Sequence, residues 1–149
     1  MGKNKAVLPP QTIGIIGGGQ FGRMRAFAAR EMGYRIVVID PTPNCPTAQV
    51  ADEQIVAPYD DEYGIQRLTE LSDVVTYEFE NVDLEMASFI EKQGKLPQGA
   101  FPLEITQNRE KEKRLLEELQ LPIPMYVIVH NGEELEKALE DFSYPVVVK

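Results

Sequence analysis

A run of glycines placed directly after a short apolar segment constrains the fold of this chain most strongly. Residues 12–16 (TIGII) are rich in β-branched side chains and predict a buried strand. Residues 17–22 (GGGQFG) follow and fit the pattern G-x-G-x-x-G. Glycines let the backbone turn tightly and approach a ligand, and the start of a following helix offers N–H groups to an anion. The segment predicts a loop that handles a phosphate-bearing ligand, although a tight turn without a ligand would use the same residues.

A helix is expected over residues 20–32, ended by Gly33. Apolar side chains recur along it at helical spacing, which predicts that they form its inner face. These side chains are Phe21, Met24, Phe27, Ala28 and Met32.

Strands and helices alternate through the next part of the chain. Further strands are expected at residues 35–39, 54–57 and 73–77. Asp60 is expected to cap a helix that runs to Leu71 with Ile65, Leu68 and Leu71 inside, and further helices are expected at residues 83–92 and 108–119. This alternation predicts an α/β fold with a parallel sheet.

Prolines and glycines suggest the domain boundaries. Residues 1–11 are polar, contain Pro9-Pro10 and predict a flexible arm, so the first domain is expected over residues 12–121. Pro122-Ile123-Pro124 predicts a linker. Residues 122–149 then begin a second pattern, with strands at 125–129 and 145–149 around a helix at 133–141. We expect this second domain to be incomplete at Lys149.

The composition excludes several classes of function. A net charge of −9 argues against nucleic acid and anionic membrane surfaces as partners, because both attract clustered Lys and Arg. No apolar run approaches the roughly 18 residues of a membrane span, and the first residues lack the pattern of a signal peptide. Cys45 and His130 are the single residues of their types, which argues against a disulfide, a histidine-based metal site and a Ser–His–Asp triad. A reducing, cytoplasmic location is expected.

The residue types around the glycine loop leave the ligand open. Asp40 ends the second strand near the position where an acid holds the ribose of a bound dinucleotide. Pro41 and Pro43 follow at once and indicate a rigid loop, which argues against a dinucleotide.

A polar cluster follows the fourth strand. Residues 78–81 (EFEN) stand at the carboxyl end of that strand, where open α/β sheets bind ligands. Two carboxylates and an amide suit the hydroxyl or amino groups of a sugar-like substrate. Solvated acids that cap the next helix are the alternative interpretation.

Two cationic positions lie later in the chain. Arg109 belongs to a charged segment, residues 106–114, most of which is expected to be a solvated helix face. Lys149 follows Val146-Val147-Val148, and a lysine on a strand can direct its charge at phosphates.

Several motifs in one order resemble a known family, the 5-(carboxyamino)imidazole ribonucleotide synthases, which are ATP-grasp ligases of purine synthesis. The resemblance extends from about residue 12 to residue 149, and the string at residues 77–82 is its most specific part. The matching segments are residues 13–20 (IGIIGGGQ), 40–43 (DPTP), 49–52 (QVAD), 77–82 (YEFENV), 96–99 (LPQG) and 144–149 (YPVVVK).

The resemblance implies a fold, a reaction and its partners. The first domain would be a Rossmann-like pre-ATP-grasp domain, and residues 122–149 would begin an ATP-grasp domain. The reaction would use ATP to activate bicarbonate, and 5-aminoimidazole ribonucleotide would capture the carboxyl group. Mg²⁺ would bridge the nucleotide phosphates. The full-length enzyme is expected to be a cytoplasmic homodimer.

The resemblance also implies which residues bind ligands. Gly19, Gln20, Phe21 and Glu78 would face the ribonucleotide, and Arg109 and Lys149 would contact ATP. Phe21 stands where the family usually has Leu, which leaves a backbone contact possible but alters local packing. No catalytic residue and no metal ligand is expected within residues 1–149, so turnover by this chain alone is not expected.

Two other hypotheses remain at this point. The chain could be the NAD(P)-binding domain of an oxidoreductase, or a non-catalytic ligand-binding module. The string at residues 77–82 favours the ligase over the oxidoreductase.

Overall fold

The computed structural model describes residues 6–148, which divide into two compact units. The first ends at Gln107 and the second begins at Asn108. The boundary predicted at residue 122 concerns the domains of the implied family and stays a prediction.

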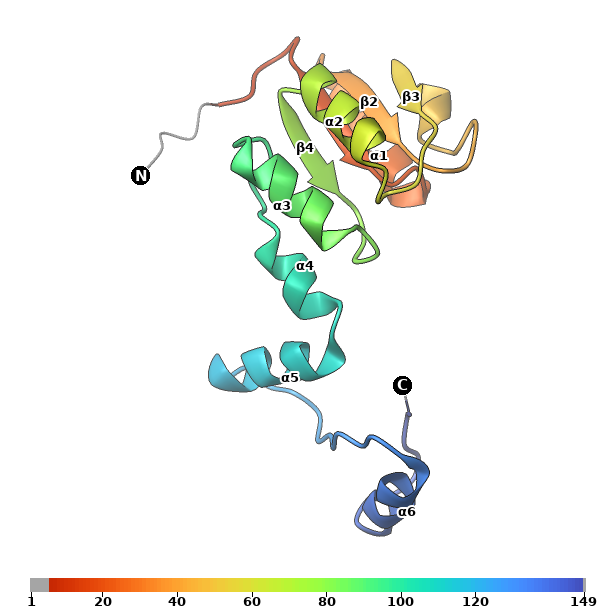
Figure 1. Ribbon diagram of the computed structural model, residues 1–149, viewed down its shortest axis with the longest axis vertical. Helices are drawn as coiled ribbons and strands as arrows, with labels where there is room; N and C mark the ends of the chain where they lie inside the picture. Colours follow the sequence, from red (N-terminus) through yellow and green to blue (C-terminus); the bar gives the residue numbers. More distant parts are fainter. Residues whose placement is uncertain (1–5, 149) are drawn as a thin grey trace. The chain divides into compact units, whose positions relative to one another are not determined.

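The core of the first unit is a four-stranded parallel sheet (Figure 1). Its strands are β1 (Thr12–Ile16), β2 (Arg35–Ile39), β3 (Glu53–Ile55) and β4 (Val74–Tyr77), in the order β3-β2-β1-β4. Ile13 of β1 lies opposite Ile36 on one side and Val74 on the other. The predicted α/β fold with a parallel sheet is therefore confirmed.

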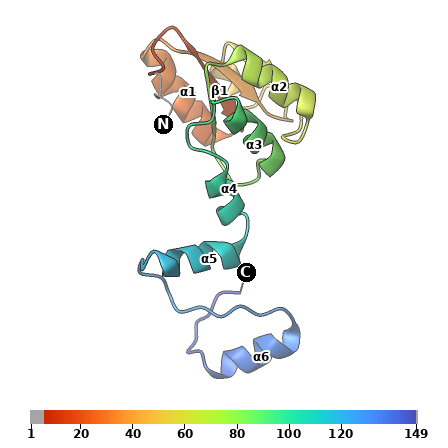
Figure 2. The same cartoon turned by 60° about the vertical axis from the view of Figure 1, so that its left-hand side comes forward.

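Alternate residues of the strands face two different helix layers. Ile15 of β1 and Val38 of β2 pack with α1 (Gln20–Glu31) on one face of the sheet. Ile16 and Ile39, one residue further along each strand, pack with α2 (Glu62–Leu71) and α3 (Leu84–Lys92). Figure 2 shows α1 on one side of the sheet and α2 and α3 on the other. Because both faces are covered, the strands are apolar almost throughout.

The predicted inner face of α1 is wrong. Phe21, Met24, Phe27, Ala28 and Met32 are all exposed, and Phe21 exposes 69% of its surface. The helix packs on the sheet through its small residues instead, because these let the helix backbone come close to the strands. The buried residues are Gly22, Ala26 and Ala29.

The helices of the α2 and α3 layer begin at aspartates. Asp61 caps α2 by accepting a hydrogen bond from the Gly64 amide at 2.5 Å, so the prediction of Asp60 as the cap is wrong by one residue. Asp83 caps α3 in the same way at 2.9 Å. Of the predicted inner residues of α2, Ile65 and Leu68 are buried, but Leu71 remains 37% exposed. A short helix that was not predicted, α4 (Phe101–Thr106), follows and buries Leu103.

The second unit contains two helices in its described part, α5 (Arg109–Glu118) and α6 (Gly132–Glu140). Asn108 and Asn131 cap them, as the predicted positions of these helices require. The strands predicted at residues 125–129 and 145–149 are not formed in the described residues, because no neighbouring strand there pairs with them. None of residues 108–148 is fully buried.

Among residues 6–148, no helix combines the length and the apolar character needed to cross a membrane.

The packing of α1 through small residues predicts an asymmetric response to enlarged side chains. Ala26→Leu should lower the free energy of unfolding of the first unit by about 1–3 kcal/mol, because the added atoms have no space against the sheet. Ala28→Leu makes the same change at an exposed position and should have little effect. Urea unfolding followed by circular dichroism measures both. Equal effects of the two substitutions would contradict this orientation of the helix.

Candidate functional site

The backbone N–H groups of the glycine loop are bonded within the chain itself. The Gly17 amide donates to the Ile39 carbonyl at 3.1 Å. The Gly18 amide donates to Asp40 Oδ2 at 2.7 Å, and the Gly19 amide donates to Glu78 Oε1 at 3.1 Å. Two of these three acceptors are carboxylates, one from the end of β2 and one from the end of β4. The loop therefore has its own anions at the place where a dinucleotide phosphate would bind in a Rossmann fold.

Two of the glycines in this loop are required because neighbouring atoms leave no space for a side chain. Gly17 has a φ of +107°, and a Cβ there would lie 2.4 Å from Phe79 Cε1. A Cβ on Gly22 would lie 2.6 Å from the Gly17 carbonyl oxygen. Both distances are too short for any side chain, so the chain's own contacts account for these glycines.

Glu78 places its carboxylate at the N-terminal end of α1. The helix has no side-chain cap of its own, since its N-cap residue is Gly19. A carboxylate near this end is favoured by the partial positive charge of the helix. Its second oxygen, Oε2, is buried and receives no hydrogen bond from any described residue. Because this oxygen is closed off from solvent, a ligand could donate to it only if the Glu78 side chain turned outward.

Two further residues fix the loop and the strand end beside it. Buried Thr47 donates from its amide to the Gly18 carbonyl at 2.9 Å and from its hydroxyl to the Gly19 carbonyl at 3.0 Å. Arg25 of α1 donates to the carbonyl of Tyr77, the residue before Glu78, at 2.8 Å. Neither residue was predicted from the sequence, because no local pattern signals a contact between positions so far apart along the chain.

The Asp40 carboxylate is hydrogen-bonded to other residues of the chain. Its side chain is buried and accepts hydrogen bonds from the Gly18 amide, from the Thr42 amide at 2.8 Å and from the Tyr59 hydroxyl at 2.7 Å. Burial alone would raise the pKa of Asp40, but these donors outweigh it and hold the pKa below the ordinary 3.8. With both oxygens engaged, Asp40 is not placed to hold the ribose of a dinucleotide. These hydrogen bonds argue against NAD(P) binding, because Asp40 was the acidic residue expected to hold the ribose.

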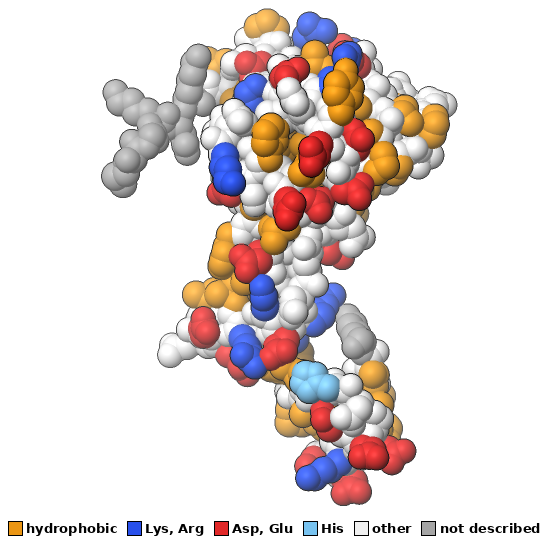
Figure 3. Space-filling view, viewed as in Figure 1, with side chains coloured by type: hydrophobic (Ala, Val, Ile, Leu, Met, Phe, Trp, Pro, Cys, Tyr) orange, Lys and Arg blue, Asp and Glu red, His pale blue; other side chains and the backbone are white. Residues whose placement is uncertain are grey.

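The residues predicted to face a ribonucleotide are partly brought together. Gly19 and Glu78 are in direct contact, whereas Gln20 and Phe21 are exposed in the first turn of α1. Glu80 and Asn81 line a neighbouring open hollow of about 580 Å³ at the carboxyl edge of the sheet. Its other lining residues are Pro41, Pro58, Tyr59, Asp60, Val82, Asp83, Leu84 and Gln107. Figure 3 shows acidic side chains spread over one face of the first unit.

The residues predicted to contact ATP are described less fully. Arg109 lies at the start of α5, is exposed and pairs with Glu112 Oε2 at 2.6 Å. Lys149 lies outside the described residues. No group of three or more His, Cys, Asp or Glu side chains within residues 6–148 is arranged to hold a metal ion.

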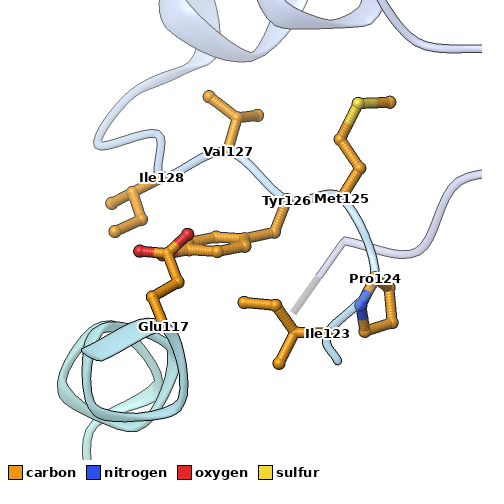
Figure 4. Close-up of a pocket in the computed structure, with 7 residues that line it drawn as sticks. All are labelled: Glu117, Ile123, Pro124, Met125, Tyr126, Val127 and Ile128. Atoms are coloured by element: carbon orange, nitrogen blue, oxygen red, sulfur yellow. The ribbon is translucent and has the colours of Figure 1, made fainter. Parts of the chain in front are cut away.

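The second unit has an open hollow of its own, of about 490 Å³. Figure 4 shows the Tyr126 ring pointing toward the carboxylate of Glu117 on α5, with Ile123 and Ile128 near it. The remaining lining residues are Pro124, Met125 and Val127. Apolar side chains dominate this hollow and Glu117 is the one charged residue among its lining residues. The Lys113 ammonium lies over the Tyr126 ring, 5.6 Å from its centroid.

The sequence of the first unit matches a family model described as the ribonucleotide synthetase preATP-grasp domain, over residues 10–107. The chain belongs to this family. The matched range includes the glycine loop and Glu78, so the Gly19–Glu78 contact lies within the part of the chain that the family model covers.

Two curated relatives of this chain carry the same name. The chain is 43% identical over 143 residues to the N5-carboxyaminoimidazole ribonucleotide synthase of Bacillus subtilis (strain 168), covering 96% of this chain and 38% of the relative. It is 45% identical over 138 residues to the protein of the same name from Staphylococcus epidermidis, covering 93% of this chain and 37% of that one. The chain spans less than two fifths of the length of these relatives.

Solved structures give the same match. The ADP complex of an N5-carboxyaminoimidazole ribonucleotide synthetase is 55% identical, with a TM-score of 0.90, over 96% of this chain and 38% of the other. An N5-carboxyaminoimidazole synthetase from Staphylococcus aureus, also complexed with ADP, is 39% identical with a TM-score of 0.87, again over 96% and 38%. The predicted resemblance and the predicted pre-ATP-grasp fold are confirmed.

The buried carboxylate of Asp40 predicts a change in stability with pH. Because its pKa is lowered in the folded protein, its contribution is present above about pH 3.8 and is lost as the pH falls through the folded pKa. The difference in unfolding free energy between wild type and Asp40→Asn should therefore shrink below about pH 4. Urea unfolding at pH 3 to 6 measures it, with Asp60→Asn at an exposed position as the control. A difference that stays constant over this range would be the contrary result.

Proposed function

We propose that this chain supplies the ribonucleotide-binding part of an ATP-dependent ligase that converts 5-aminoimidazole ribonucleotide and bicarbonate into 5-(carboxyamino)imidazole ribonucleotide, a step of purine biosynthesis. The observation that carries the proposal is the Gly19–Glu78 contact inside a unit that matches the ribonucleotide synthetase preATP-grasp family. The names of the relatives support the same reaction.

The rest of the reaction requires more protein than this chain contains. The chain covers 38% of the Bacillus subtilis relative, so ATP activation of bicarbonate depends on residues outside it. Mg²⁺ would neutralise the phosphates of ATP during transfer. The ligands of this metal are also proposed to lie outside this chain. We propose a cytoplasmic, homodimeric enzyme for the full-length protein.

The electrostatics of the loop favour the sugar of the ribonucleotide over its phosphate. Two like unit charges about 4 Å apart repel by roughly 1 kcal/mol in water and about 4 kcal/mol at a protein surface. A phosphate placed on the Gly18 and Gly19 amides would meet the Asp40 and Glu78 carboxylates at such distances and would have to displace them. Ribose hydroxyls can instead donate to the Glu78 carboxylate, whose buried Oε2 has no donor among the described residues and would have to turn toward the ligand.

Gln20 and Phe21 would complete this end of the site. They follow Gly19 in the first turn of α1, where backbone N–H groups have no partner within the helix. The exposed Phe21 ring stands at the same turn, so a ribonucleotide seated on Glu78 would lie close to it. We therefore retain Gly19, Gln20, Phe21 and Glu78 as the proposed ribonucleotide contacts.

Arg109 and Lys149 are the proposed ATP contacts of this chain. The exposed Arg109 guanidinium pairs only with Glu112 among the described ion pairs, and a surface pair of this kind is weak enough to exchange for a phosphate. Lys149 would add a second cation at the start of the ATP domain.

Steady-state kinetics of the full-length enzyme test these roles, because each substitution should raise the KM for one substrate and spare that for the other. Glu78→Gln should raise the KM for 5-aminoimidazole ribonucleotide about tenfold or more and leave that for ATP nearly unchanged, because one charged acceptor is lost. Arg109→Ala and Lys149→Ala should each raise the KM for ATP by a similar factor and spare that for the ribonucleotide. Arg114→Ala removes another exposed arginine of α5 and serves as the control.

Two results would contradict the proposal. If Glu78→Gln changes neither KM, Glu78 does not face the ribonucleotide. If Arg109→Ala behaves like Arg114→Ala, the charged face of α5 is only solvated. Tighter binding of NAD(H) than of the ribonucleotide by the wild-type chain would instead support the oxidoreductase hypothesis.

A further inference from the structure

We infer that Asp40 and Tyr59 form a positioning pair for the glycine loop, in which the Tyr59 hydroxyl fixes the Asp40 carboxylate and Asp40 fixes the Gly18 amide. The pair would thereby set the direction of the neighbouring Gly19 amide toward Glu78. The part of this inference that concerns ligand binding rests on the proposed function, whereas the part that concerns the loop rests on the contacts alone.

The hydrogen bonds of Asp40 form a short chain from Tyr59 to the loop. The Tyr59 hydroxyl and the Gly18 amide both donate to the same oxygen of Asp40, Oδ2, each at 2.7 Å. The Thr42 amide holds the other oxygen. A buried carboxylate with this many donors is held in one orientation, because any rotation would leave a buried polar group unpaired.

The peptide planes of the loop pass this constraint to Gly19. The plane between Gly17 and Gly18 is held by Asp40 through the Gly18 amide. The next plane is held at both ends, by Thr47 on the Gly18 carbonyl and by Glu78 on the Gly19 amide. Glycine adopts many backbone angles, so without Asp40 the first of these planes would be free to rotate. The direction of the Gly19 amide would then depend on Thr47 and Glu78 alone.

Tyr59 also contacts the segment that carries Glu78. Its ring packs edge-on against Phe79, with ring centroids 5.2 Å apart and an interplanar angle of 67°. Phe79 directly follows Glu78 and is the side chain that a Cβ on Gly17 would strike. Tyr59 therefore touches both carboxylate-bearing segments, through its hydroxyl after β2 and through its ring after β4.

Tyr59 remains a hydrogen-bond donor under ordinary conditions. Burial, together with the hydrogen bond to Asp40 and the negative charge of that residue, raises the pKa of the Tyr59 phenol well above its usual 10. The hydroxyl thus stays protonated at every pH at which the protein would be assayed.

Tyr59→Phe tests the pair, because it removes the hydroxyl and keeps the ring against Phe79. Two quantities are measured on the 149-residue chain: amide hydrogen exchange by NMR, and the Kd for 5-aminoimidazole ribonucleotide by calorimetry. Exchange of the Gly18 amide should become about tenfold faster, as expected for loss of one charge-assisted hydrogen bond. The Kd should rise as well, because a less ordered loop must be fixed when the ligand binds. Core amides such as Val38, which open only on global unfolding, should become faster by no more than the loss of overall stability that urea unfolding of Tyr59→Phe measures.

Tyr34→Phe is the matched control. It removes a hydroxyl that donates to the Val7 carbonyl at 3.0 Å, a contact that does not involve the loop. It should leave both Gly18 exchange and the Kd unchanged. The double variant Tyr59→Phe/Asp40→Asn should exchange at Gly18 no faster than Asp40→Asn alone, because the hydroxyl acts through that carboxylate.

The outcomes separate the inference from the proposed function. If Gly18 exchange in Tyr59→Phe equals that in Tyr34→Phe, the positioning role is wrong. If Gly18 responds but the Kd does not, the pair fixes the loop without affecting the ligand, and the binding half of the inference fails. If the wild-type chain binds no ribonucleotide, the proposed function fails in this chain while the exchange data still decide whether the pair fixes the loop.

Discussion

Two carboxylate-to-amide hydrogen bonds determine how the rest of the candidate site is built. Asp40 holds the Gly18 amide and Glu78 holds the Gly19 amide, and the two acids come from the ends of β2 and β4 on either side of β1. The parallel sheet makes this possible, because it brings the carboxyl ends of its strands to one edge. A loop that resembles a phosphate-binding loop in sequence thus carries two negative charges of its own.

The packing of α1 serves the same arrangement. Gly22, Ala26 and Ala29 let the helix lie close to the sheet, so that its N-terminal end meets Glu78. Larger residues on this face would move the helix away and separate Gly19 from the carboxylate. Because α1 packs on the sheet through its small residues, its larger apolar side chains are left exposed.

The sequence predicted the order of strands and helices well, because β-branched runs and helix caps are local signals. It also predicted that Gly19 and Glu78 belong to one site, through the resemblance and through their places at strand ends. It misassigned the face of α1, because helical spacing identifies two faces and the larger apolar residues suggested the wrong one. It could not predict Thr47 or Tyr59, whose contacts with Gly19 and Asp40 join positions 28 and 19 residues apart without any periodic pattern. The strands predicted in the second unit depend on partners that the described residues do not supply.

A crystal structure of the chain bound to 5-aminoimidazole ribonucleotide would show which part of the ligand contacts the glycine loop. A ribose hydroxyl is expected within hydrogen-bond distance of the Glu78 carboxylate, with Glu78 still bonded to the Gly19 amide and the phosphate remote from the three glycines. A phosphate seated on the Gly18 and Gly19 amides, with the Glu78 side chain displaced, would contradict this expectation.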